Sequence, residues 1–133
     1  MKIEILALCD AATDQQGKLN LLGAFDCIFA RQVPVVHPQC SVALRIRFHK
    51  NEAGTHRIQI SIADEDGRFV MQSLDANITV QVDKYGESAV ANLVMNIQQL
   101  KFERFGDYSV NVVIDGKKQG SIPLSVRQAP GST

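Results

Sequence analysis

Apolar and polar residues alternate with a period of two along this chain, in short runs separated by turn residues. From Cys40 to Phe48 every second residue is apolar, and the positions between them include Ser41, Arg45 and Arg47. This alternation is typical of a β-strand that buries one face and exposes the other, and no helical stripe of similar length accompanies it. The pattern predicts an all-β fold, an antiparallel β-sandwich of about eight strands. The remaining runs cover residues 3–9, 19–29, 56–62, 76–82, 89–97, 108–114 and 122–126.

The turns between these runs set an expected strand register. Residues 51–55 carry Gly54 and suit a three-residue hairpin loop closed by a left-handed glycine. Such a loop would pair Phe48 with Ile58 and Ile46 with Ile60, so that inward apolar residues meet each other. Further turns are expected at residues 14–17, 64–68 and 115–117, together with a bulge at Gly120.

The length and the charge balance of the chain limit the kinds of protein that it can be. The 133 residues suffice for one domain, expected at residues 1–128 with a loose tail at 129–133, and the prolines at 34 and 38 predict a crossing loop. Fourteen basic residues balance fourteen acidic ones, so no nucleic-acid partner is expected. No stretch approaches the roughly 20 apolar residues that span a bilayer, so no membrane is expected either. An odd count of three cysteines without an export signal predicts free thiols, no inter-sheet disulfide and a cytoplasmic location.

Two parts of the sequence resemble known families. Gly106-Asp107-Tyr108 resembles the corner of immunoglobulin-like sandwiches, where a tyrosine hydroxyl binds the crossover backbone, although the usual cysteine and tryptophan are missing. The segments 10–26, 35–38, 53–56 and 64–67 resemble a family of small bacterial single-domain proteins of uncharacterised function. The first resemblance implies an immunoglobulin-like sandwich. The second implies one compact domain and brings no activity or binding residues.

No residue pattern reaches the specificity of a catalytic, cofactor or metal site. His37 lies three residues before Cys40, but strand parity places the Cys40 thiol in the core, where it is inert. The same parity points His49 outward and His56 inward, so these histidines do not converge on a metal. The acidic residues 64–66 precede a glycine and are read as turn formers rather than calcium ligands. We therefore expect no enzyme and no cofactor.

Two surfaces are candidates for binding a partner. The expected hairpin places a basic face on its solvent side, with the alternative that these arginines merely pair with neighbouring carboxylates. The first two strands are apolar on both sides and must be covered, either by the loop at residues 33–36 or by another subunit in a homodimer. The basic face comprises Arg45, Arg47, His49 and Arg57, and the self-association surface comprises Leu6, Leu8, Leu22 and Ile28.

The sequence does not state a function directly. The missing site chemistry and the surplus apolar surface favour a non-catalytic interaction or structural module that binds a protein partner or itself. The alternative is a module that binds a small ligand or carbohydrate, although the chain has no tryptophan and two tyrosines. An enzyme with an unrecognised site ranks third.

Overall fold

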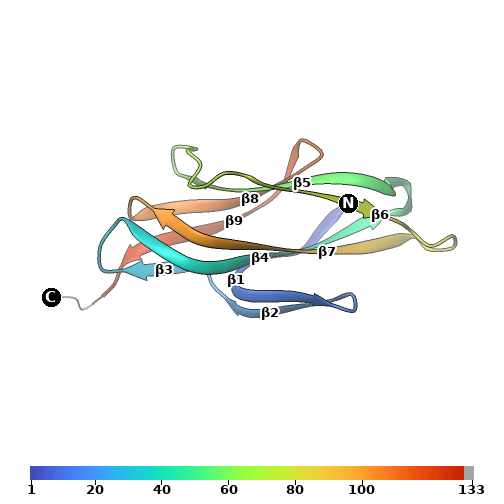
Figure 1. The fold of residues 1–133 in the computed structure, drawn as a ribbon. Coiled ribbons are helices and arrows are strands. Elements are labelled where there is room, and N and C mark those ends of the chain that lie inside the picture. Colours follow the sequence, from blue (N-terminus) through green and yellow to red (C-terminus); the bar gives the residue numbers. More distant parts are fainter. Residues whose placement is uncertain (131–133) are drawn as a thin grey trace.

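The computed structural model describes residues 1–130 and shows two stacked β-sheets (Figure 1). In the described residues one sheet has four strands in the order β2-β1-β4-β7, and the other has five in the order β3-β9-β8-β5-β6. The all-β, two-sheet prediction is therefore confirmed, with nine strands instead of about eight. The elements are β1 (Lys2–Gln15), β2 (Lys18–Ala24), β3 (Cys27–Ala30), β4 (Val35–His49), the 3-10 turn η1 (Lys50–Glu52), β5 (Gly54–Asp64), β6 (Leu74–Val80), β7 (Ser88–Phe102), β8 (Gly106–Ile114) and β9 (Lys117–Gln128).

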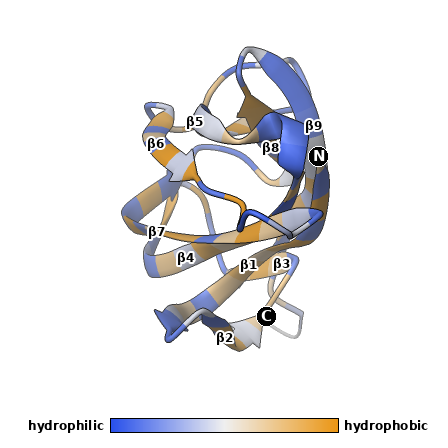
Figure 2. Ribbon diagram, turned by 90° about the vertical axis from the view of Figure 1, so that its right-hand side faces the viewer, coloured by the Kyte–Doolittle hydropathy of each residue, from blue (hydrophilic) through white to orange (hydrophobic). Residues whose placement is uncertain are grey.

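The core lies between the sheets and is built by the alternating residues. The inward side chains of the central strands β4, β5 and β8 have essentially no exposed surface. Figure 2 shows the resulting hydrophobic and hydrophilic bands along the strands. Burying one such aliphatic side chain contributes about 1.5–3 kcal/mol, so this core is the main source of stability. These central core residues are Cys40, Val42, Leu44, Ile46, Phe48, Ile58, Ile60, Ile62, Val110, Val112 and Ile114.

The prediction that β4 and β5 form a hairpin is wrong. β4 pairs with β1 and β7, whereas β5 pairs with β6 and β8 in the opposite sheet. The chain crosses between the sheets through η1, which is capped by the His49 ring and the Glu52 carboxylate. Alternation shows that each strand buries its apolar face, but it does not show which strand lies beside it. Two strands that face each other across the sandwich bury their apolar residues in the same core as two paired strands would. Phe48 and Ile58 therefore share the core without being paired.

The expected strand at residues 19–29 is two strands in different sheets. β2 pairs antiparallel with β1, whereas β3 pairs parallel with β9, so the sandwich is not entirely antiparallel. The crossing is held by backbone hydrogen bonds, from the Phe25 N–H to the Leu8 carbonyl (2.9 Å) and from the Ser125 N–H to the Asp26 carbonyl (2.9 Å). The apolar pattern of residues 19–29 suits a strand in either sheet, so it does not show that the chain changes sheet within this segment.

The four-stranded sheet curls so that the β1–β2 hairpin lies on its outer side, away from the five-stranded sheet (Figure 2). The Asn92 side-chain amide of β7 donates to the Gly17 carbonyl at the hairpin tip (3.0 Å). Ala43 and Ser41 point outward from β4, yet they are 0% and 1% exposed. The chain thus covers part of its own outer face with its own hairpin.

The turn predictions hold at the other connections. Gln16 and Gly17, and again Asp115 and Gly116, have positive φ angles in two-residue hairpin turns. The β8–β9 ladder shifts register beside Gly120, as the expected bulge requires.

The predicted loop through Pro38 is shorter than expected, because β4 already begins at Val35. The β4–β7 ladder skips Pro38, which has no N–H to donate, and also skips the facing Gln99, whose φ is 55°. In the expected tail, the Ala129 N–H donates to the Ala30 carbonyl (2.8 Å), and residues 131–133 lie outside the described part of the chain.

Candidate functional site

The basic face separates into two sheets. Arg45 and Arg47 do share the outer face of the four-stranded sheet, and both donate to Glu4 of β1, with Nε–Oε distances of 3.0 and 2.6 Å. The hydrogen bond from Arg47 is the main cause of a lowered pKa at Glu4, and Arg45 adds to it. This pairing with a neighbouring carboxylate is the alternative that the sequence left open.

Of the other two members, His49 is the last residue of β4 and Arg57 lies in the opposite sheet. The His49 ring accepts a hydrogen bond from the Asn51 N–H (3.3 Å) and so caps η1. Arg57 is on β5 in the opposite sheet, where its guanidinium pairs with Asp75 of β6 (3.1 Å). Since the four side chains do not share one face, they do not form a common positive stripe.

The expected self-association surface is also divided. Leu8 and Ile28 are buried in the core at 2% and 7% exposure, Leu6 is half-buried, and Leu22 is 70% exposed. Leu6 and Leu8, together with Phe25 and Ile122, line a groove of about 430 Å³. Leu22 is not among the residues that line this groove.

The cysteines and histidines are used within the fold. Burial raises the pKa of the Cys40 thiol to about 11, with nearby Cys9 adding to the effect. The His37 ring packs against the Phe25 ring at a tilt, with ring centroids 5.3 Å apart. Within residues 1–130, no group of three or more His, Cys, Asp or Glu side chains is arranged to hold a metal ion. The three cysteines are free, as the odd count predicts.

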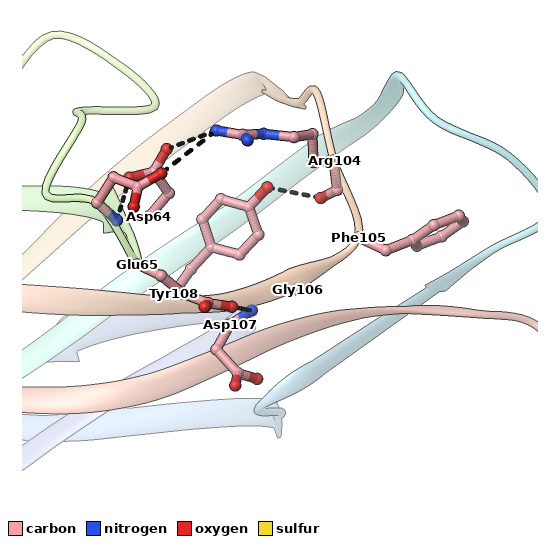
Figure 3. A pocket seen from close by; sticks show the side chains of 8 residues that line it. Asp64, Glu65, Arg104, Phe105, Gly106, Asp107 and Tyr108 are labelled. Carbon is pink, nitrogen blue, oxygen red and sulfur yellow. Dashed lines mark hydrogen bonds and ion pairs between the residues drawn. The ribbon is translucent and has the colours of Figure 1, made fainter.

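The acidic turn and the tyrosine corner meet at one end of the sandwich (Figure 3). The Tyr108 hydroxyl donates to the Arg104 carbonyl (2.6 Å), the bond that the Gly-x-Tyr resemblance implies. The Asp64 carboxylate accepts from the backbone N–H groups of Asp66 and Arg68, both at 2.9 Å, as expected of a turn former.

The same corner is closed by ion pairs. The Arg104 guanidinium lies 3.5 Å from Asp64 and 3.8 Å from Asp66 (Figure 3). The Glu65 carboxylate accepts from the Asp107 N–H (3.0 Å). A hollow of about 230 Å³ remains between these groups, and the arginine already supplies the positive charge that a bound cation would bring. We read this end as a structural closure of the sandwich.

The free edge of β7 is the feature without a structural partner. In the described residues β7 has one hydrogen-bonded neighbour, β4, although it is 15 residues long. From Ser88 to Leu100 it contains no charged residue, no proline and no glycine. Soluble proteins normally protect an edge with charges, proline, bulges or short length, because its free N–H and C=O groups otherwise attract another strand.

The other three edge strands carry such protection. β3 has four residues, and β2 and β6 have seven each. β2 also includes Lys18 and Gly23, and β6 includes Asp75. β7 is therefore the exception among the edges that the structure describes.

The inner face of β7 is incompletely covered. Ala89, Ala91, Leu93 and Met95 point into the sandwich but stay half-buried, whereas their partners on β4 are fully buried. On the opposite sheet the edge strand β6 shows the same partial exposure at Leu74 and Ile78. The sandwich is thus open along the side between β6 and β7.

Sequence reasoning missed this edge, although its signal was present. The absence of charge and of strand breakers over residues 88–100 is visible in the sequence. Its meaning depends on β7 lying at the edge of a sheet, and alternation does not give strand order.

Comparison with known proteins places the chain in a family. The sequence model of DUF6941, a family of unknown function, matches residues 4–127. The chain belongs to this family. No curated protein matches the DUF6941 chain. Among solved structures it is similar to the Pseudomonas fluorescens alkylpurine DNA glycosylase AlkC, bound to DNA containing an abasic-site analogue, with a TM-score of 0.54 and 11% identity. The match covers 95% of this chain and 30% of that one, and at this identity it concerns the fold alone. In the described residues no helix is long and apolar enough to cross a membrane.

Proposed function

We propose that this member of the DUF6941 family is a non-catalytic protein-interaction module that binds by accepting an added strand at the free edge of β7. The observation that carries the proposal is the 15-residue edge strand without charge, proline or glycine between Ser88 and Leu100. Strand addition draws its affinity from main-chain hydrogen bonds and its specificity from alternate side chains.

The open side of the sandwich supports the same reading. An added strand would cover the half-buried Leu93 and Met95 while it bonds the free backbone groups beside them. The immunoglobulin-like assignment belongs to this proposal and is supported by the hydroxyl bond of Tyr108 at the sandwich corner. The free thiols fit a reducing compartment, which supports a cytoplasmic location.

Small-ligand or carbohydrate binding has weaker support. The hollow at the sandwich corner is lined by carboxylates paired with Arg104, and the hydroxyl of its one tyrosine is engaged by the backbone. Sugar sites commonly offer open aromatic platforms, which this corner does not provide.

The test compares partner capture by the wild-type chain and two variants. Leu93→Lys places a charge on the half-buried inner face of β7, and Leu22→Lys places the same charge on the exposed surface of β2 as a control. We expect proteins retained by the wild-type chain, including differently tagged copies of it, to be lost with Leu93→Lys and kept with Leu22→Lys, as quantified by mass spectrometry. Equal retention by all three forms would refute the proposal, provided that circular dichroism shows the variants folded.

A further inference from the structure

We propose that the strand added to β7 is β7 of a second copy of this chain, running antiparallel about a two-fold axis at Leu93. This inference rests on the proposed function and names the partner. A two-fold axis perpendicular to the sheet sets an edge strand antiparallel to its own copy, so the same surface serves both sides of the interface.

The parity of β7 restricts how the two copies align. Residues that lie directly opposite each other in a ladder point to the same face of the sheet. The odd-numbered residues of β7 from Ala89 to Ile97 point into the sandwich, whereas Asn92, Val94 and Asn96 point outward. Inward residues of one copy must therefore face inward residues of the other, which requires a single residue to lie opposite itself.

The ends of the regular segment select that residue. β7 begins at Ser88, and its extended conformation is broken at Gln99, which has a φ of 55°. The uninterrupted segment therefore ends at Gln98, and Leu93 is midway between Ser88 and Gln98. Centring the pair on Leu93 uses the full segment, about 36 Å of strand at the usual rise per residue.

This register gives compatible side-chain pairs. On the inner face Leu93 lies opposite Leu93 of the second copy, Ala91 opposite Met95, and Ala89 opposite Ile97. Small residues thus face large ones on either side of the axis, which favours close packing. These residues are among those left half-buried on the open side, apart from Ile97, which is 5% exposed.

Charge does not oppose the pairing. No charged side chain lies within residues 88–98, so no like charges meet across the ladder. The whole chain has a formal net charge of zero, so two copies carry no overall repulsion. Strand addition takes its specificity from alternate side chains, and the alternate inward side chains of β7 complement those of its own copy in this register. The resulting assembly is one continuous eight-stranded sheet, formed from the two four-stranded sheets.

The first experiment measures mass by size-exclusion chromatography with light scattering over a range of concentrations of the full chain. We expect the wild-type chain to dimerise, and both Leu93→Lys and Leu93→Glu to raise the dimer dissociation constant about tenfold or more, because like charges then face each other at the axis. An equimolar mixture of the two variants should regain the dimer, since the charges become complementary. This regain separates a broken interface from a misfolded chain.

The control is Leu22→Lys, which should dimerise as the wild type does. A wild-type chain that is monomeric throughout, a dimer that Leu22→Lys alone disrupts, or a mixture that fails to recover would each overturn the proposal. A monomer whose capture of a different protein still depends on Leu93 would refute this inference and leave the proposed function standing.

The second experiment tests the register by cysteine crosslinking. Facing residues of an antiparallel ladder have Cα atoms about 4.5–5.5 Å apart, within the range of a disulfide. We expect Leu93→Cys to form a covalent dimer on mild oxidation and Val90→Cys not to, because Val90 faces Asn96 of the second copy. The wild-type chain gives the background of its native cysteines. Crosslinking of Val90→Cys in preference to Leu93→Cys would contradict the register.

Discussion

At the scale of single residues, the ring of His56 lies between two hydrogen-bond acceptors that favour its charged form. Its Nδ1 lies 2.6 Å from the Asp115 carboxylate and its Nε2 lies 2.6 Å from the Glu52 carbonyl, while the ring stacks on Phe48 at 4.6 Å. Burial acts to lower the pKa of His56, but the hydrogen bonds to Asp115 and Glu52 outweigh it and raise that pKa. A proton on each ring nitrogen satisfies both acceptors at once. His56 thereby ties η1 to the β8–β9 turn.

The raised pKa makes part of the stability dependent on pH. The contribution of His56 is complete below the pKa of the unfolded chain, about 6.5, and is lost as the pH rises through the higher folded value. We expect His56→Gln to cost about 1–2 kcal/mol of unfolding free energy at pH 5.5, a modest value because Asp115 is partly exposed and its attraction is screened by solvent. The cost should be smaller at pH 8.5, because the wild-type histidine loses its charge as the pH rises. Urea unfolding at both pH values checks this. Asp115→Asn should flatten the same pH dependence, and an unchanged slope would contradict the assignment.

A second residue-scale prediction concerns Gly23. Its φ is +69°, and an added Cβ would meet the Asp10 side chain, lying 2.9 Å from Cγ. Gly23→Ala therefore combines left-handed strain with a close contact and should cost about 1–3 kcal/mol in chemical unfolding. Gly17→Ala is the matched control, because φ is +78° there with nothing within 4 Å of the added Cβ. Equal losses at the two sites would show that the Asp10 contact does not matter.

At the scale of elements, the corner leading from β7 to β8 depends on one hydroxyl. Tyr108 is 8% exposed, its ring packs edge-on against Phe102 at 4.9 Å, and its hydroxyl donates to the Arg104 carbonyl. The hydrogen bond fixes the crossover between the two sheets while the ring fills the end of the core. The Gly-x-Tyr spacing of Gly106 and Tyr108 predicted this hydrogen bond from the sequence.

Tyr108→Phe isolates the contribution of that hydroxyl. The ring and its packing remain, so we expect a loss of about 1 kcal/mol in unfolding free energy, the usual net value of one hydrogen bond. Phe105→Leu alters a half-buried neighbour without touching the hydrogen bond and controls for general effects at this corner. If Tyr108→Phe left the free energy of unfolding unchanged, water would be replacing the lost hydrogen bond at no cost.

Sequence alternation predicted the strands and their buried sides but not their neighbours. The inward residues Val42, Leu44 and Ile46 satisfy the same pattern whether β5 lies beside β4 or across from it. A loop of residues 50–53 can turn within one sheet or cross to the other, and in the structure it crosses as η1, which is capped by His49 and Glu52. For the same reason Arg57 lies in the other sheet from Arg45 and Arg47, whose shared face the alternation did predict. The β7 edge was missed because its role depends on strand order.

At the scale of the whole molecule, the chain has a partial third layer made by the β1–β2 hairpin. This layer lies over β4 and leaves Ala43 with no exposed surface on the side opposite the core. It accounts for much of the apolar character of β1 on both faces without a second subunit. The side left open is therefore between β6 and β7, far in sequence from the N-terminal strands first considered.

Enlarging Ala43 tests how tightly the hairpin is seated. We expect Ala43→Leu to cost about 1–3 kcal/mol in thermal or urea unfolding, because the added atoms must displace the covering hairpin. Ala11→Leu, at an exposed position of β1, should be nearly neutral. A tolerated Ala43→Leu would indicate a loosely seated hairpin, and faster amide hydrogen exchange in β2 would then accompany it.

The crossing between β4 and β5 also has a kinetic consequence. After β4 the chain leaves the four-stranded sheet and forms β5 and β6 in the other sheet. It returns only with β7, the second neighbour of β4, so that Val42 pairs with Met95, which lies 53 residues later in the sequence. In the described residues three of the eight successive strand pairs are hydrogen-bonded neighbours, and the other pairings require long loops to close first, at a cost in chain entropy. Refolding in a stopped-flow instrument should accordingly take milliseconds to seconds. During synthesis, the ribosome must release most of the chain before β4 finds its last partner.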